Sequence, residues 1–107
     1  MQTKIVLTDV ALSDLFNIND YFLQTVSDKK ASEIINSLEN AVNSLAEFPE
    51  RGSYPKELLT LGIRQYRQII VKPYRIIYEV FPEKIIVHAV LDGRRDIQTL
   101  FTQRLLN

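Results

Sequence analysis

Apolar positions in the first half of the chain recur at helical spacing. A short apolar run at Lys4–Leu7 predicts a strand, and the next residues, Thr8 and Asp9, are types that begin helices. The first stripe of apolar spacing consists of Leu12, Leu15, Phe16, Asn19, Phe22 and Val26. The second stripe begins after Ser27 and Asp28 and consists of Ala31, Ile34, Ile35, Leu38, Ala41, Val42 and Leu45. Both follow the spacing of an amphipathic helix. Two such helices joined by a short turn predict an αα-hairpin.

The second half changes from helical to strand character. Phe48-Pro49 ends the second helix, because a residue before proline avoids the helical region. Pro49–Gly62 has the prolines and glycines of a loop, with room for one helical turn at Lys56–Leu61. The segments that follow from Ile63 are rich in Ile, Val and Tyr and predict three strands: "IRQYRQIIV", "YRIIYEVF" and "KIIVHAVL".

The three strands are predicted to form an antiparallel meander, because only Lys72-Pro73 and Pro82-Glu83 separate them. In the middle strand, alternation puts Tyr74, Ile76, Tyr78 and Val80 on one face and Arg75, Ile77, Glu79 and Phe81 on the other. In the last strand, Ile85, Val87, Ala89 and Leu91 alternate with Ile86, His88 and Val90. One face should take the helical hairpin, and the other would be exposed unless something covers it.

A short helix should follow the last strand, with Asp96 at its start. The order strand, two helices, three strands and a short helix predicts an α+β two-layer sandwich. At 107 residues the chain is long enough for one domain with a modest core, so residues 1–107 are expected to form a single domain.

Composition excludes several kinds of site. The chain has no cysteine and one histidine, which excludes thiolate and multi-histidine metal sites. It also has no phosphate-binding glycine loop and no nucleophile elbow, so we expect no metal and no cofactor. The N-terminal "MQTKIVLTDV" does not have the apolar core of a signal peptide, and no stretch could span a membrane. The cytoplasm is therefore the expected location.

Charge is unevenly distributed along the chain. Residues 1–50 contain three Lys or Arg against eight Asp or Glu, whereas residues 51–107 contain ten against five. The formal net charge of the chain is zero, because the first half has a net charge of −5 and the second half a net charge of +5. This asymmetry suggests a polar partner for the basic half, although chance segregation of solvated charges would give the same pattern.

The residues best suited to binding an anion are arginines on or beside the predicted strands: Arg64, Arg67, Arg75, Arg94 and Arg95. A guanidinium is always charged and matches phosphates and carboxylates. The alternative for each is a weak surface salt bridge, for example between Arg75 and Glu79 on one strand face. Arg94 and Arg95 precede a helix start, where the helix dipole disfavours cations, so these two favour a functional interpretation.

The remaining candidates for chemistry are aromatic or titratable. His88 is the one side chain with an ordinary pKa near neutrality, but it lies mid-strand among apolar residues, which favours a partly buried structural role. Tyr66, Tyr74 and Tyr78 could stack on bases, yet their alternation along strands favours core packing.

Three blocks of this sequence resemble successive parts of the RelE/ParE superfamily of bacterial type II toxins: "LAEFPERGSYPKEL", "GIRQYRQIIVKPYRIIYEV" and "VLDGRRDIQTL". The resemblance covers nearly the whole chain. It implies a cytoplasmic toxin neutralised by a cognate antitoxin, a segment of which folds on binding and covers the toxin's sheet edge and apolar surface. Operator DNA would then be contacted only indirectly, through the antitoxin.

The resemblance leaves two activities open. ParE-like members inhibit DNA gyrase, whereas RelE-like members cut messenger RNA on the ribosome with basic residues and often a C-terminal tyrosine or histidine. Here the possible catalytic set would be Arg75, His88, Arg94 and Arg95, and "DIQTLFTQRLLN" after Arg95 contains no Tyr, His or Lys. Arginine is a poor proton donor because it stays protonated. The set looks incomplete, which favours a non-enzymatic gyrase inhibitor.

The predicted target-binding residues are Arg67, Arg75, Arg94 and Arg95. A third possibility is an inactive relative that acts with its antitoxin in operon autoregulation.

Overall fold

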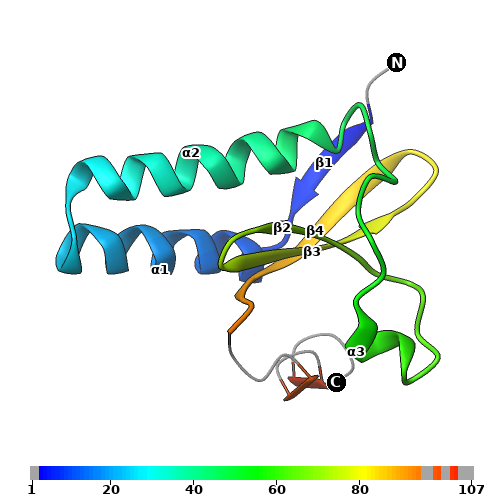
Figure 1. The fold of residues 1–107 in the computed structure, drawn as a ribbon. Helices are drawn as coiled ribbons and strands as arrows, with labels where there is room; N and C mark the ends of the chain where they lie inside the picture. The colour runs from blue at the N-terminus through cyan, green and yellow to red at the C-terminus, as the bar shows by residue number, and fades with distance from the viewer. Residues whose placement is uncertain (1–2, 95–97, 100–101, 104–107) are drawn as a thin grey trace.

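The computed structural model describes residues 3–94, 98–99 and 102–103. Two long helices pack on one side of a four-stranded sheet, and a short third helix lies on the other side (Figure 1). The elements are β1 (Lys4–Leu7), α1 (Asp9–Thr25), α2 (Asp28–Ser44), α3 (Lys56–Leu59), β2 (Arg67–Val71), β3 (Tyr74–Val80) and β4 (Lys84–Asp92). The predicted α+β class and element order are confirmed.

The two long helices begin at the predicted capping residues. Thr8 Oγ1 accepts a hydrogen bond from Ala11 N at 3.1 Å, and Ser27 Oγ accepts one from Lys30 N at 3.0 Å. Each side chain thereby satisfies one of the backbone N–H groups that a helix start leaves without a partner. The turn between the helices is short, and α1 packs against α2 as an αα-hairpin.

The sheet has the strand order β1-β4-β3-β2. β2, β3 and β4 form the predicted antiparallel meander, and β1 adds to β4 in parallel. β2 begins at Arg67, four residues later than the sequence predicted. The difference arises because Ile63 and Tyr66 are used in packing: Ile63 N donates to Leu58 O at 2.9 Å, and both side chains cover the sheet beside α3.

A β-bulge in β4 overturns the predicted alternation of that strand. Ile77 pairs with Ala89 and Tyr78 with Val87, which leaves His88 as an additional residue. Such a residue shifts the phase of alternation along the strand. As a result Val90 joins the core on the helical side, while Ala89 packs on the opposite face.

Both faces of the sheet are buried by apolar packing. The core on the helical side contains Ala11, Ile18, Leu38, Val42, Leu45, Ile69, Tyr74, Ile76, Tyr78, Ile85, Val87 and Val90. On the other face, a smaller outer core contains Leu58, Tyr66, Ile77, Ala89 and Leu91, with Ile63 packed against it. The sequence left open what might cover this face; α3 and the segment after it do so.

The buried side of α1 differs from the predicted stripe. Ala11, Asp14 and Ile18 are buried, whereas Phe16 is 67% exposed. Asp14 Oδ2 accepts a hydrogen bond from Val90 N at 2.9 Å. β1 pairs with β4 only as far as Val87, so the edge of β4 beyond that residue needs another partner. The carboxylate of Asp14 is that partner, and for this reason Asp14 faces the sheet although it is polar.

The C-terminal helix is described in part. Residues 98–99 and 102–103 are helical, and the expected helix start at Asp96 lies outside the described residues, as does Arg95. In the described part of the chain, no helix has the length and apolar character needed to cross a bilayer.

The outer core predicts a large difference between two leucines of the α3 region. Leu58 is fully buried and Leu61 is 49% exposed. Leu58→Ala should lower the free energy of unfolding by about 2–5 kcal/mol because it leaves a cavity, whereas Leu61→Ala should change it by less than about 0.5 kcal/mol. Urea unfolding measures both. Equal effects would show that α3 does not seal this face.

Candidate functional site

Cationic side chains gather at one end of the sheet, around the β2–β3 turn. A shallow pocket there, called the turn pocket below, is lined by Ile70, Lys72, Pro73, Arg75, Gly93 and Arg94. Gly93 N donates to Pro73 O at 2.7 Å and joins the end of β4 to the turn. A Cβ at Gly93 would lie 2.9 Å from that carbonyl oxygen and 3.3 Å from Arg75 Nε. Glycine is therefore required for this close approach.

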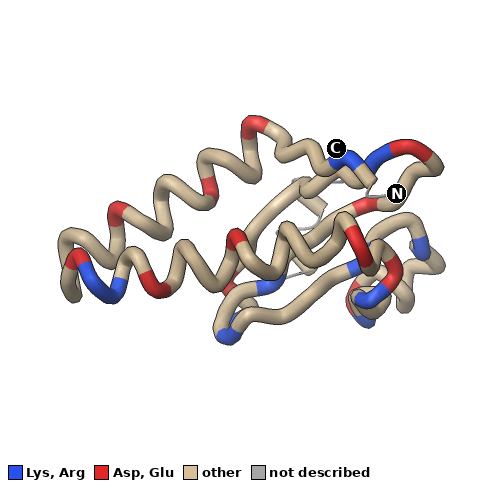
Figure 2. Tube along the Cα trace, turned by 90° about the horizontal axis from the view of Figure 1, so that it is seen from above, with Lys and Arg blue, Asp and Glu red and all other residues tan. Residues whose placement is uncertain are grey.

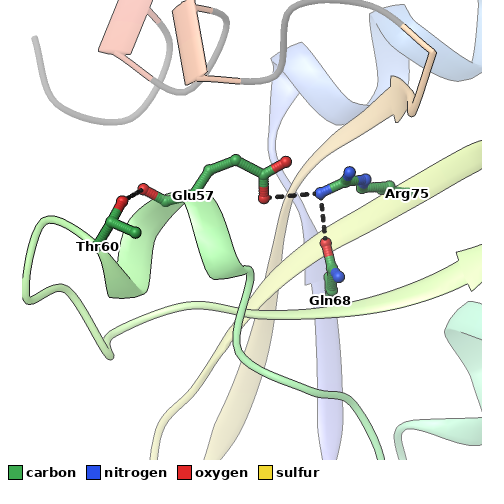
Figure 3. Close-up of polar contacts among 4 residues, drawn as sticks. All are labelled: Glu57, Thr60, Gln68 and Arg75. Carbon is green, nitrogen blue, oxygen red and sulfur yellow. Dashed lines mark hydrogen bonds and ion pairs between the residues drawn. The ribbon is translucent and has the colours of Figure 1, made fainter.

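Arg75 is held by polar partners on the outer face of the sheet. Its Nη1 donates to Glu57 Oε1 at 2.9 Å and to Gln68 Oε1 at 3.2 Å (Figure 3). The side chains of Arg75 and Glu57 are only 17% and 18% exposed. The predicted pairing of Arg75 with Glu79 is wrong, because α3 brings a carboxylate closer to the guanidinium than the strand does.

The charge of Arg75 acts on Glu57 in turn. Burial raises the pKa of the Glu57 carboxyl, but the hydrogen bond from Arg75, a backbone hydrogen bond and the charges of Arg75 and Lys56 together lower the pKa below its ordinary value. Glu57 is therefore ionised at neutral pH. The backbone carbonyl of Glu57 also accepts a hydrogen bond from Thr60 Oγ1 at 2.9 Å, within the same turn of chain (Figure 3).

The exposed guanidinium of Arg94 is oriented by one carboxylate, that of Asp92. Its Nε and Nη2 donate to the two oxygens of Asp92 at 2.9 and 2.7 Å, and its backbone N donates to Asp92 Oδ1 at 2.9 Å. This forked contact fixes the guanidinium, and Asp92 raises the pKa of Arg94. The side chain remains 73% exposed. Arg94 is thus oriented by the protein yet accessible to a partner.

Arg67 lies apart from the turn pocket. It pairs with Tyr78 in the sheet and so points to the opposite face from Arg75. Its Nη1 donates to Gly52 O at 2.9 Å, and its guanidinium lies 4.6 Å from the centre of the Tyr54 ring. These contacts fasten the loop before α3. Arg64, the remaining arginine among the candidates for anion binding, is exposed.

His88 forms a separate cluster at the bulge. Its Nε2 lies 2.9 Å from Glu79 Oε1, and its ring meets the edge of Tyr66 at 5.3 Å between centroids. Gln65 Nε2 donates to Glu79 Oε2 at 3.0 Å. Glu79 is four residues from Arg75 along β3, a distance of about 13 Å, with Ile77 between them. His88 is therefore not beside Arg75, and its predicted structural role agrees with these contacts.

The three tyrosines considered for base stacking are buried in the core, as predicted. Burial raises the pKa of Tyr66, Tyr74 and Tyr78. The Tyr78 hydroxyl accepts a hydrogen bond from Gly52 N at 2.9 Å. Within the described ranges, no group of three or more His, Asp or Glu side chains is arranged to hold a metal ion.

The sequence did not indicate three members of this region. Lys72 and Ile70 line the turn pocket, and their position next to the hairpin turn could have suggested it. Glu57 gave no such signal, because its contact with Arg75 spans 18 positions of sequence and depends on how α3 packs.

A second surface feature is an apolar groove between α1 and α2. It has a volume of about 380 Å³ and is lined by Leu7, Leu12, Leu15, Phe16, Asn19, Ile35, Glu39, Val42 and Asn43. Acidic residues recur along both helices, while many of the basic residues lie over the sheet and loops (Figure 2). The groove is therefore apolar within an acidic surrounding.

The sequence is similar to those of known bacterial toxins. A family described as the ParE toxin of the type II toxin–antitoxin system parDE matches residues 5–97. Toxin RelE2 of Caulobacter vibrioides is 40% identical over 77 residues, which cover 72% of this chain and 80% of the relative. Toxin ParE3 of the same organism is 26% identical over 94 residues, covering 88% and 90%.

A solved structure shares the fold. The chain is similar to one in a structure titled as the chromosomal ParDE TA system from P. aeruginosa, with a TM-score of 0.69 and 16% sequence identity. The match covers 83% of this chain and 94% of the other.

The Glu57–Arg75 ion pair predicts a pH-dependent contribution to stability. Because the pKa of Glu57 is lowered in the folded state, the pair stabilises the fold above the ordinary pKa of 4.5, and this contribution is lost as pH falls through the folded-state value. Glu57→Gln should lower the free energy of unfolding by about 1 kcal/mol at pH 7. Urea unfolding should show that the difference in unfolding free energy between the natural chain and Glu57→Gln is smaller at pH 3 than at pH 7. A difference independent of pH would contradict the stabilising role of the ionised Glu57–Arg75 pair.

Proposed function

The chain belongs to the ParE toxin family of type II toxin–antitoxin systems, and from this premise we propose that it arrests growth by inhibiting DNA gyrase. As a type II toxin it has an antitoxin as its partner. We propose that the antitoxin neutralises it by direct binding in the cytoplasm, and that contacts with operator DNA come from the antitoxin.

The observation that carries the gyrase proposal is the separation of Arg75 from His88. Cleavage of RNA by its own 2′-hydroxyl needs proton transfer at two oxygens as well as charge stabilisation. His88 is engaged by Glu79, which lies about 13 Å along β3 from Arg75. The carboxylate that does contact Arg75 is Glu57, whose lowered pKa makes it a weak base. This arrangement supports a toxin that acts by binding.

The proposed binding surface for gyrase is the turn pocket and the exposed arginine beside it. Arg94 is fixed by Asp92 and accessible, and Ile70 is an exposed apolar side chain on the same pocket. Arginines next to apolar side chains are typical of protein interfaces. We include Arg95 in this surface because it follows Arg94 in sequence, and Arg75 because it lines the turn pocket. Arg67 faces the opposite side of the sheet and is the weakest of the predicted contacts.

Ribosome-dependent cleavage of messenger RNA is the second candidate. It is favoured by one observation, the 40% identity with a relative named toxin RelE2. In that case Arg75, Arg94 and Arg95 would stabilise the phosphate, and His88 would have to reach the reaction by a rearrangement of the bulge. Inhibition of gyrase and cleavage of messenger RNA are distinguishable in purified systems.

The proposed site for the antitoxin is the groove between α1 and α2. An amphipathic helix that places apolar side chains against Leu12, Phe16 and Ile35 would fit its lining. Basic residues at the edges of such a helix would complement the acidic residues of α1 and α2.

The gyrase proposal predicts that two adjacent arginines are needed for inhibition. Purified toxin should inhibit supercoiling by DNA gyrase in a dose-dependent way, and the double variant Arg94→Ala, Arg95→Ala should require a roughly tenfold or higher concentration. The matched control is Lys29→Ala, Lys30→Ala, an exposed basic pair at the far end of the helical hairpin. Folded toxin that leaves gyrase unaffected would refute the proposal.

The groove proposal predicts a specific loss of neutralisation. Phe16→Glu should weaken antitoxin binding roughly tenfold or more, because it places a charge in an apolar contact. Val10→Glu changes an exposed apolar residue of the same helix that does not line the groove, and should bind normally. Titration calorimetry with the antitoxin encoded beside the toxin gene measures both. Equal affinities would place the antitoxin elsewhere.

A further inference from the structure

The Glu57 carboxylate occupies the position in which Arg75 would otherwise bind an external anion. A guanidinium binds carboxylates and phosphates through the same N–H groups. The Nη1 atom of Arg75, which carries two N–H groups, donates to Glu57 Oε1 at 2.9 Å and to Gln68 Oε1 at 3.2 Å. Figure 3 shows the carboxylate of Glu57 reaching from α3 to the guanidinium of Arg75.

The backbone that carries Glu57 is held in place by the fold. Its neighbour Leu58 is fully buried in the outer core, and Pro55 before the helix is also buried. Leu58 N and Leu59 N both donate to the carbonyl of Pro55, at 3.1 and 3.0 Å. Displacing Glu57 from Arg75 by moving α3 would require exposing Leu58, which the apolar packing opposes.

The same pattern recurs at the second arginine of the turn pocket. Arg94 is paired with Asp92, so two of the three cations that line the pocket are matched by carboxylates of the chain itself. Lys72, Arg75 and Arg94 contribute three positive charges, and Glu57 and Asp92 remove two. A nucleic-acid site depends on uncompensated cations, because phosphate contacts provide most of the non-specific affinity.

We propose that Glu57 is an internal counter-ion that prevents Arg75 from binding the phosphates of single-stranded RNA. In this view α3 is a specificity element: it leaves Arg94 available to a protein partner and makes the outer sheet face a poor nucleic-acid site. Glu57 acts through Arg75 and is therefore a positioning residue. The inference goes beyond the proposed function, and it is incompatible with cleavage of RNA at a phosphate held by Arg75.

The test is direct binding of RNA by purified toxin. The probe is a fluorescently labelled 12-nucleotide oligouridine RNA, and anisotropy is measured across a salt series starting at 50 mM. Glu57→Gln removes the charge and keeps the size of the side chain. It should bind about tenfold more tightly than the natural chain, equivalent to one additional charge-assisted hydrogen bond. Its plot of log affinity against log salt should steepen by about 0.7, the value for one phosphate contact on a single strand.

Three further variants identify the cause of any gain. Adding Arg75→Ala to Glu57→Gln should return binding to the natural level, because the gain depends on the released guanidinium. Glu83→Gln makes the same charge change at an exposed position at the opposite end of the sheet and should have no effect. Glu57→Asp retains the charge but draws the carboxylate back, and should give a smaller gain; it also serves as the test if Glu57→Gln does not fold.

Several outcomes would overturn the proposal. These are a folded Glu57→Gln variant that binds RNA no better, a gain that survives loss of Arg75, or an equal gain in Glu83→Gln. Tight, Arg75-dependent binding of RNA by the natural chain would also overturn it. None of these outcomes bears on gyrase inhibition, which is measured separately.

Discussion

The structure depends on one constraint: the central strands of the sheet are apolar on both faces. In β4, Val87 and Val90 face the helical hairpin while Ala89 and Leu91 face the other way, and Ile76 and Ile77 of β3 divide in the same manner. Each face must be covered, because exposed apolar surface of this extent is costly. The helices cover one face, and α3 with the segment before β2 covers the other.

Covering the second face determines where the charged side chains lie. Leu58 must reach Ile77, and in doing so α3 brings Glu57 within hydrogen-bond distance of Arg75. The end of the sheet at the β2–β3 turn is covered by neither layer, so Lys72 and Arg94 remain accessible there. At this end of the sheet Arg75 and Arg94 are paired with Glu57 and Asp92, whereas Lys72 is exposed.

The sequence predicted the elements better than it predicted their contacts. Helix caps at Thr8 and Ser27 and the antiparallel meander follow from local rules, which depend on neighbouring residues alone. The bulge at His88 was not predictable from alternation, because an additional residue leaves no local mark in a strand that is apolar on both sides. The Arg75 partner was missed for a related reason: the nearest carboxylate in space came from α3, not from the same strand. Arg94, which the sequence singled out as a candidate for binding, is oriented by its contact with Asp92.

The most direct measurement of the central claim, that this toxin acts by binding a target in DNA replication and not by cleaving RNA, is made in cells. After induction without the antitoxin, incorporation of labelled thymidine and of labelled methionine is followed over the first minutes. We expect DNA synthesis to fall first while protein synthesis continues. An immediate arrest of protein synthesis with DNA synthesis still running would contradict it and would identify messenger RNA as the target.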